Sequence, residues 1–343
     1  MPIRAVNLGG WLVLEKWMTP ELFKGTQAED EYHLLKALGE GAKALILSHR
    51  QSFITEKDFK WISDYGIDTV RIPVGHWLFD AEWPYIAAKE TLDLAFEWAK
   101  KYHLTIMLDV HAAKGCQNGF DNGGLSGVMN WHKDKKNIDH TLDFIEMLAK
   151  TYKDHVALGG IQLLNEPRWD IPLDIIQPFY LEGYQRVRKH CNDDIYVVFH
   201  DGFRLEAWES FFKDNAFTNT YLDTHMYQVF SDNDRLRGMS EVIEKVSVKR
   251  LNELKKVTPY TRVIVGEFSL GIHERALSEA KDAFTKDALY RAVGNSLLVT
   301  FEQVDGWVFW NYTLSKHSTQ YNAGWSFKRN VELGYLPSQI RKD

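Results

Sequence analysis

The sequence lacks the features of membrane-spanning, disulfide-stabilised and exported proteins. No apolar run approaches the ~20 residues needed to cross a bilayer, and the N-terminus has no hydrophobic stretch typical of a signal peptide. Only two cysteines, Cys116 and Cys191, occur among 343 residues, which excludes a disulfide framework but leaves one bridge between them open. The sequence as given therefore indicates a cytoplasmic protein, or a secreted one if it is a mature form with a new methionine.

Basic stripes and nucleotide-binding motifs are also missing. The 41 Lys and Arg residues are interspersed with 47 Asp and Glu residues, and the net charge is -6. This pattern favours neither nucleic acid nor a membrane surface as a partner, and a neutral substrate is compatible with it. No P-loop or Gly-x-Ser-x-Gly elbow occurs, which argues against phosphotransfer and esterase chemistry. We expect no cofactor.

Strand-like apolar runs alternate with segments of helical periodicity along the whole chain. The runs are residues 4–8, 69–74, 104–110, 161–164, 195–199, 221–224, 263–265 and 306–309. Alternation of this kind implies parallel strands with helical crossovers, and about eight pairs predict a single (β/α)₈ barrel domain over residues 1–343. An open doubly wound sheet is the alternative, but no dinucleotide-type glycine-rich turn follows the first run.

Two of these runs end in a carboxylate. Residues 161–164 lead into Asn165, Glu166 and Pro167, and about a hundred residues later 263–265 lead into Gly266 and Glu267. Either glutamate on its own could be a surface loop acid. Since the C-terminal ends of barrel strands meet at one face, however, the two together can perform acid and base chemistry on one bond.

Other polar or aromatic residues stand at further strand ends. They are Arg71, His111, His225 with Tyr227, and Trp310. Such groups would converge at the barrel mouth and separate the pKa values of the two carboxylates. His111, His225 and Asp109 could also be imagined as metal ligands, but no close ligand spacing such as His-Glu-x-x-His supports this, and we expect no metal.

With these motifs the chain resembles glycoside hydrolase family 5 of clan GH-A. Asn165-Glu166-Pro167 matches the acid/base motif of that family and Gly266-Glu267-Phe268 its nucleophile motif. Longer strings resemble the exo-β-1,3-glucanase subtype best known from fungi. These strings are residues 7–15 with Thr19-Pro20, residues 117–122 and residues 225–230.

The resemblance implies a retaining β-glucosidase-type hydrolase acting on β-1,3- or β-1,4-linked glucans or oligosaccharides. Glu267 would be the nucleophile and Glu166 the general acid and base, while Asn165 would bind the sugar 2-OH. We further expect Arg71 and Tyr227 to hydrogen-bond to Glu267, with Arg71 lowering its pKa. Burial and the nearby anion should raise the pKa of Glu166.

The same resemblance implies exo action. Glu15, Asp121 and Asn122 match positions that cap the terminal glucose in the relatives, so that glucose would be released from non-reducing ends. Aromatic positions at the pocket entrance match Phe120, Phe203 and Phe230. The alternative interpretation is that Glu15 caps a local turn and that these rings belong to the core.

Departures from the subtype keep other hypotheses open. Phe268 stands where tryptophan is usual, Ala112 follows His111 where glycine is usual, and the sequence beyond Trp310 diverges. The fungal relatives are secreted and disulfide-bonded, so we expect an intracellular or bacterial cousin. An endo-acting β-1,4-glucanase or mannanase, a β-glucosidase for short oligosaccharides or glycolipids, and a non-catalytic glycan-binding barrel are the alternatives.

Overall fold

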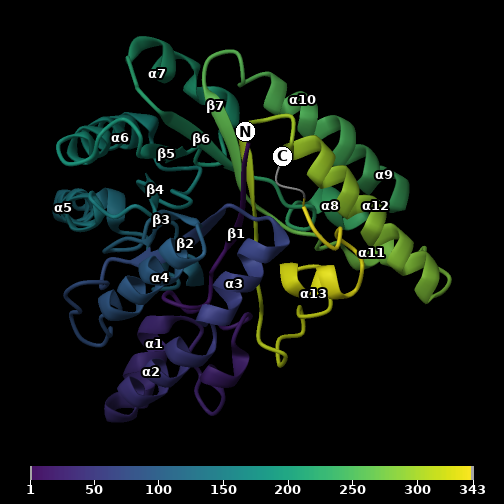
Figure 1. Ribbon diagram of the computed structural model, residues 1–343, viewed down its shortest axis with the longest axis horizontal. Helices are drawn as coiled ribbons and strands as arrows, with labels where there is room; N and C mark the ends of the chain where they lie inside the picture. The colour runs from purple at the N-terminus through teal and green to yellow at the C-terminus, as the bar shows by residue number, and fades with distance from the viewer. Residues whose placement is uncertain (1, 341–343) are drawn as a thin grey trace.

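Eight parallel strands close on themselves into a barrel in the computed structural model, which describes residues 2–340 (Figure 1). The strands are β1 (Ile3–Asn7), β2 (Thr69–Gly75), β3 (Thr105–Ala112), β4 (Leu158–Gln162), β5 (Tyr196–His200), β6 (Thr220–His225), β7 (Arg262–Phe268) and β8 (Gly306–Phe309). Each pairs with its neighbour in sequence, and β1 also pairs with β8. The predicted (β/α)₈ barrel is therefore confirmed, and the open sheet is wrong.

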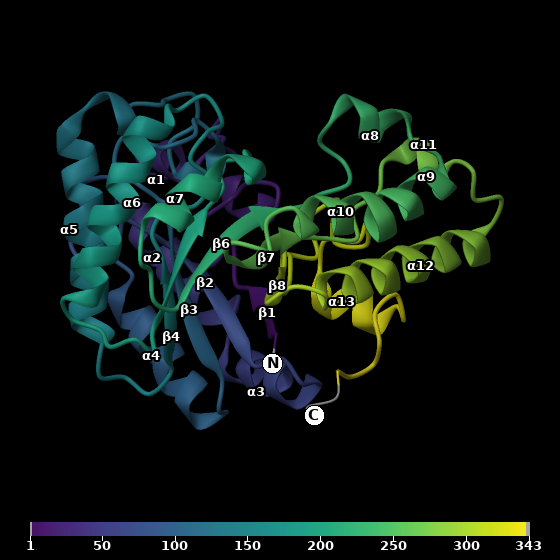
Figure 2. The same ribbon diagram turned by 90° about the horizontal axis from the view of Figure 1, so that it is seen from above.

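Helices cover the outside of the barrel. The α-helices are α1 (Glu31–Leu38), α2 (Ala42–Ser52), α3 (Glu56–Tyr65), α4 (Lys89–Lys101), α5 (Lys135–Tyr152), α6 (Leu173–Arg188), α7 (Glu209–Asp214), α8 (Asp232–Leu236), α9 (Met239–Glu244), α10 (Arg250–Lys255), α11 (Glu274–Leu277), α12 (Ala283–Phe301) and α13 (Phe327–Glu332). Helices α8 to α12 lie together on one side, and α1, α2, α5 and α6 lie on the other (Figures 1 and 2).

The inward-facing side chains of the strands change from apolar to polar along the barrel axis. The lower layer of the interior is a small apolar cluster of Ala5, Met107, Tyr196, Val198, Tyr221, Ile264 and Val308. Because side chains alternate along a strand, the next inward positions lie two residues further on. At that level stand Asn7, Arg71, Asp109, His200 and Asp223, all fully buried. The strand sequences therefore place a polar layer at the C-terminal end of the barrel.

Strand β4 differs most from its sequence prediction. We expected residues 161–164, but the strand begins at Leu158 and ends at Gln162. The residues missed are Leu158, Gly159 and Gly160, and the two glycines disfavour a strand by propensity. A Cβ on Gly160 would lie 2.1 Å from the Tyr196 ring, so glycine is required there to let that ring fill the barrel. Tertiary packing therefore determines this strand.

Three further observations bear on the expectations from sequence. Cys116 and Cys191 are separate buried thiols, so they form no bridge with each other. The long connection after β3 contains only two short 3₁₀ helices before α5 begins at Lys135. Among residues 2–340, no helix combines the length and hydrophobicity that crossing a membrane requires.

Phe268, at the end of β7, offers a test of the packing between strands and helices. It is fully buried against Phe301, Trp307 and Phe309. Phe268→Ala should lower the free energy of unfolding by about 3–5 kcal/mol, measured by denaturant titration, because it leaves a cavity. Phe284→Ala, which removes a ring that is 76% exposed, is the control and should change stability by less than about 0.5 kcal/mol. Equal effects of the two substitutions would contradict this account.

Candidate active site

Glu166 and Glu267 both reach the C-terminal mouth of the barrel, by different routes. Glu267 is part of β7, whereas Glu166 follows the end of β4 in a tight turn with a φ angle of 43°. This left-handed conformation is uncommon for a residue other than glycine and is found at functional sites held by their surroundings. The turn is held by the Asn165 N–H, which donates to the Val110 carbonyl at 2.9 Å, and by Gln117 Nε2, which donates to the Asn165 carbonyl at 2.9 Å.

The fully buried guanidinium of Arg71 connects the nucleophile position to the barrel interior. Nη1 donates to Glu267 Oε1 at 3.1 Å. Its other contacts are with Asn7 Oδ1 at 2.7 Å, Gln162 Oε1 at 2.8 Å, Asn165 Oδ1 at 2.7 Å and Asp109 Oδ2 at 3.1 Å. The other oxygen of Glu267 accepts a hydrogen bond from the Tyr227 hydroxyl at 2.7 Å. Both hydrogen bonds expected from the sequence are confirmed.

A single histidine nitrogen lies between the two glutamates. Nδ1 of His225 is 2.6 Å from Glu166 Oε1 and 3.4 Å from Glu267 Oε2. The separation between these two carboxylate oxygens is therefore at most the sum of the two distances. That sum is below ~6.5 Å, the smallest carboxylate separation typical of inverting glycosidases. The geometry thus favours the closer spacing of a retaining pair.

The pKa values of the two glutamates differ from the expectation. Burial raises the pKa of Glu267, and the negative charge of Glu166 raises it further. The positive charges of His225 and Arg71 lower this pKa but do not cancel the increase. Arg71 therefore acts in the expected direction, but the net pKa of Glu267 is raised.

The expectation for Glu166 is wrong. Burial does raise its pKa, but the hydrogen bond and charge of His225 outweigh that effect and bring the pKa of Glu166 down to about 2. Burial also lowers the pKa of His225, yet Glu267, Asp223 and Glu166 surround the ring and together raise its pKa well above 6.5. The exchangeable proton thus belongs to the Glu166–His225 pair as a unit.

Several buried polar atoms near the glutamates, His200 Nε2 among them, have no partner within residues 2–340. Two of these are Asn165 Nδ2 and His111 Nε2. His111 is oriented by the Asp109 carboxylate, 2.6 Å from its Nδ1, and its ring stacks on Trp310 with 5.5 Å between centroids. Gly9 makes room for this indole, since a Cβ there would lie 2.6 Å from it. A sugar hydroxyl could satisfy each of the two unpartnered atoms.

Glu15, Asp121 and Asn122 reach the same mouth with different roles. Glu15 is buried, accepts a hydrogen bond from Trp17 Nε1 at 2.8 Å, and has a pKa raised well above 4.5 by burial and then by Asp121. Burial likewise raises the pKa of Asp121. Asn122 instead donates to Glu166 Oε2 at 3.0 Å, so it contacts the acid/base residue directly.

The three phenylalanines expected at the entrance are partly exposed, as an entrance requires. Phe120 is 37%, Phe203 40% and Phe230 66% exposed. Phe230 packs on Tyr227 and Trp325. Phe120 and Phe203 do not contact each other directly; each packs on Trp169, with centroids 6.4 Å and 6.2 Å apart.

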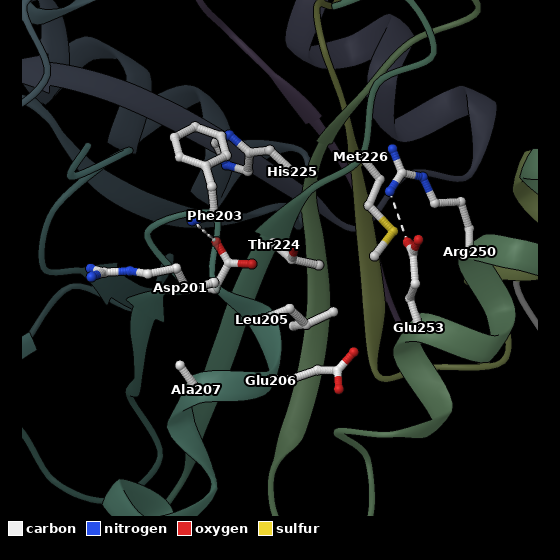
Figure 3. A pocket seen from close by; sticks show the side chains of 11 residues that line it. Asp201, Phe203, Leu205, Glu206, Ala207, Thr224, His225, Met226, Arg250 and Glu253 are labelled. Atoms are coloured by element: carbon white, nitrogen blue, oxygen red, sulfur yellow. Dashed lines mark hydrogen bonds and ion pairs between the residues drawn. The ribbon is translucent and has the colours of Figure 1, made fainter. Parts of the chain in front are cut away.

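A pocket of about 700 Å³ lies beside this entrance (Figure 3). It separates the segment 201–207 from Met226, Arg250 and Glu253, and Phe203 and His225 are both among the residues that line it. Neither catalytic glutamate lines this pocket. The side chain of His225 is fully buried and bonded to Glu166, so the pocket borders the catalytic centre from outside.

Glu166, His200 and His225 are the one group within residues 2–340 whose ligand atoms lie close enough to hold a metal ion, all within 4.8 Å of one another. The group considered from the sequence was a different one, namely His111, His225 and Asp109. Histidine binds a metal in its neutral form, whereas the pKa of His225 is raised well above 6.5. The donor set therefore fits a shared proton better than an ion.

Comparisons with known proteins agree with this geometry. The family model described as Cellulase (glycosyl hydrolase family 5) matches residues 39–315. This chain belongs to glycosyl hydrolase family 5. A glucan 1,3-beta-glucosidase of Blumeria graminis is 33% identical over 382 residues, covering 98% of this chain and 87% of the relative. A sporulation-specific glucan 1,3-beta-glucosidase of Saccharomyces cerevisiae is 32% identical over 393 residues, covering 98% and 86%.

Both alignments are longer than the 343 residues of this chain, so the relatives carry insertions that it lacks. Among solved structures, a rutinosidase from Aspergillus niger superposes with a TM-score of 0.82 at 21% identity, covering 97% of each chain, and it supports the fold alone. As a family 5 member the chain is a retaining glycoside hydrolase, a class that uses a pair of carboxylates, and Glu166 and Glu267 are two carboxylates that His225 connects at the barrel mouth.

The sequence reasoning missed several residues of this family 5 site. His200 ends β5 and packs on His225 with 4.4 Å between ring centroids. Asp223 lies 3.2 Å from His225 Nε2 and accepts from Gln162 Nε2 at 2.7 Å. A polar residue at the end of an apolar run, the signal used for His225, was also available for His200. No local sequence pattern distinguished Trp169 from the other tryptophans as a candidate site residue.

The shared proton predicts how the pH profile depends on His225. In the wild type the catalytic proton is lost only as pH rises through the raised pKa of His225, which sets the basic limb of kcat/KM. In His225→Asn, Glu166 must hold that proton alone, so the basic limb should move to lower pH by about one unit or more. His317→Asn, at an exposed site, should leave the profile unchanged. The measurement is kcat/KM against pH on an aryl β-glucoside, and an unmoved limb in His225→Asn would refute proton sharing.

Proposed function

We propose that this chain is an exo-acting β-glucosidase that releases glucose from the non-reducing ends of β-1,3-linked glucans or oligosaccharides. The observation that carries the proposal is the position of His225 Nδ1 between Glu166 and Glu267. The glucan 1,3-beta-glucosidase names of the relatives support the substrate class.

Glu267 acts as the nucleophile in the first half of the reaction. A carboxylate oxygen bonds to the anomeric carbon as the glycosidic C–O bond breaks, and Glu166 transfers a proton to the departing oxygen. Arg71 and Tyr227 hold the two oxygens of Glu267 in place, so little reorganisation is needed. His225 supplies the hydrogen bond through which the proton is available to Glu166.

The second half of the reaction releases the sugar. Water bonds to the anomeric carbon, Glu166 accepts its proton, and the ester to Glu267 breaks. The two inversions give net retention. Asn165 Nδ2, which is buried and has no protein partner, is placed to donate to the 2-OH, an interaction that strengthens as the ring becomes oxocarbenium-like.

Exo action is supported by the buried carboxyl groups around Glu15. Glu15 is buried, and its raised pKa responds to Asp121, Glu267 and Glu166, which places the four carboxyl groups in one electrostatic environment. A terminal glucose can hydrogen-bond to Glu15 and Asp121 through hydroxyls that a longer chain would not have free. An uncharged polyol is a suitable partner for carboxyl groups that burial disfavours as anions.

Removal of the nucleophile tests the mechanism. Glu267→Ala should lower kcat by about 10⁴-fold or more, and added azide should restore part of it by forming an α-glucosyl azide, detected by NMR. Glu274→Ala removes an exposed carboxylate seven positions further along the chain. It is the matched control and should keep full activity. The wild type should first release the β anomer from a β-glucoside. An α product, or normal turnover by Glu267→Ala, would contradict the assignment.

Glu15 provides the test of exo action. Glu15→Ala should cost about 2 kcal/mol or more of transition-state binding, measured as lower kcat/KM on laminari-oligosaccharides, because the hydrogen bonds between the buried carboxyl group and the terminal glucose are lost. Glu29→Ala removes a neighbouring exposed carboxylate and should have no such effect. On laminarin the wild type should release free glucose with little fall in viscosity. A rapid viscosity drop with little glucose would instead indicate an endo-acting enzyme, and binding without hydrolysis a non-catalytic barrel.

A further inference from the structure

Three consecutive loops of the barrel mouth each present one exposed aromatic ring. Phe120 comes from the loop after β3, Trp169 from the loop after β4, and Phe203 from the loop after β5. The rings form a continuous wall, since Trp169 lies 6.4 Å from Phe120 and 6.2 Å from Phe203 between ring centroids. Trp169 is the most exposed of the three at 54%.

Trp169 has no evident structural role. It belongs to none of the hydrophobic clusters of the described residues, and its indole N–H forms no hydrogen bond within residues 2–340. Large exposed aromatic surfaces that adjoin one another on a soluble protein commonly mark binding sites. An indole also suits a sugar, because its face packs on C–H groups while its N–H can meet a hydroxyl.

Side-chain contacts order the loop around Trp169. Arg168 lies over the indole, 5.9 Å from the ring, and is itself held by two hydrogen bonds of 2.7 Å to Asp170. The backbone of the neighbouring loops is held as well: the Phe203 N–H donates to Asp201 Oδ1 at 2.7 Å, and the Phe120 N–H donates to Asn118 Oδ1 at 3.0 Å. Loops whose backbone is already ordered lose less conformational entropy when a ligand binds.

Contacts connect this wall to the acid/base residue and so to the leaving-group side. Phe203 packs on His200 at 5.3 Å and His200 on His225 at 4.4 Å, and His225 bonds to Glu166. On the other flank, Asn122, from the same loop as Phe120, donates to Glu166 Oε2. Since Glu166 protonates the departing oxygen, the wall faces the part of the substrate that leaves.

We propose that Trp169 is a specificity-determining residue that binds the third glucose unit of a β-glucan, counted from the non-reducing end, on the leaving-group side of the site. This assignment rests on the proposed function. The first unit lies against the buried carboxyl group of Glu15, the second lies at the entrance beside Phe203, and Trp169, the most exposed ring of the wall, stacks on the third. The enzyme therefore prefers oligosaccharides of three or more units over the disaccharide.

The test compares kcat and KM on laminaribiose, laminaritriose, laminaritetraose and 4-nitrophenyl β-glucoside. Trp169→Ala should raise KM for the triose and tetraose about tenfold with little change in kcat, because the stacking contact is the same in ground and transition states. Laminaribiose and the aryl glucoside should be hydrolysed at wild-type efficiency. Trp169→Tyr should restore most of the preference for longer chains.

Trp83→Ala is the matched control, since Trp83 is 73% exposed and its ring lies against Lys36 rather than in the aromatic wall, and it should behave as wild type on all four substrates. Equal losses on every substrate would assign Trp169 to support of the catalytic loop and overturn the proposal. Unchanged KM for the longer chains would also overturn it, with the proposed function left standing. If the wild type hydrolyses the aryl glucoside but no laminari-oligosaccharide, the β-1,3-glucan function itself fails and this assignment fails with it.

Discussion

The buried charge of Arg71 is the constraint on which the rest of the site depends. An unpaired guanidinium inside a barrel would carry a desolvation cost of several kcal/mol, so its surroundings must supply oxygens in the right directions. Those oxygens come from Asn7 on β1, Asp109 on β3, Glu267 on β7, and Gln162 and Asn165 at the end of β4. Satisfying one cation therefore positions the nucleophile and the residue beside the acid/base glutamate together.

Asp223 organises the opposite side of the mouth in the same way. It accepts from the Gly266 N–H at 2.6 Å and from Gln162, and it lies against His225. A Cβ on Gly266 would lie 2.2 Å from this carboxylate, which explains why glycine precedes the nucleophile. Both networks include Gln162, so the orientations of Glu166 and Glu267 are coupled through shared buried hydrogen bonds, which are costly to leave unmade.

The two sides of the mouth differ in chemistry. Around Glu15 and Asp121, carboxyl groups whose pKa values are raised chiefly by burial suit a small, fully enclosed polyol. Around Phe120, Trp169 and Phe203, exposed rings on fixed loops offer an open surface. One end therefore recognises a single sugar by hydrogen bonds, and the other can accommodate leaving groups of varied length by stacking, which needs fewer directional contacts.

The sequence by itself determined the barrel and the identity of the two glutamates. The side-chain periodicities that distinguish strands from helices are local properties of the sequence. Polar residues at the ends of apolar runs, such as Glu267 and His225, can also be recognised locally. Tertiary structure decided the rest. Strand β4 includes Gly160 because the Tyr196 ring needs its space. The pKa of Glu166 is lowered because a histidine 59 positions away donates to it, and Asn122 bonds to that same carboxylate. Trp169 joins Phe120 and Phe203 only because three loops meet at one rim. Distances between residues remote in sequence control these features, and no local pattern encodes such distances.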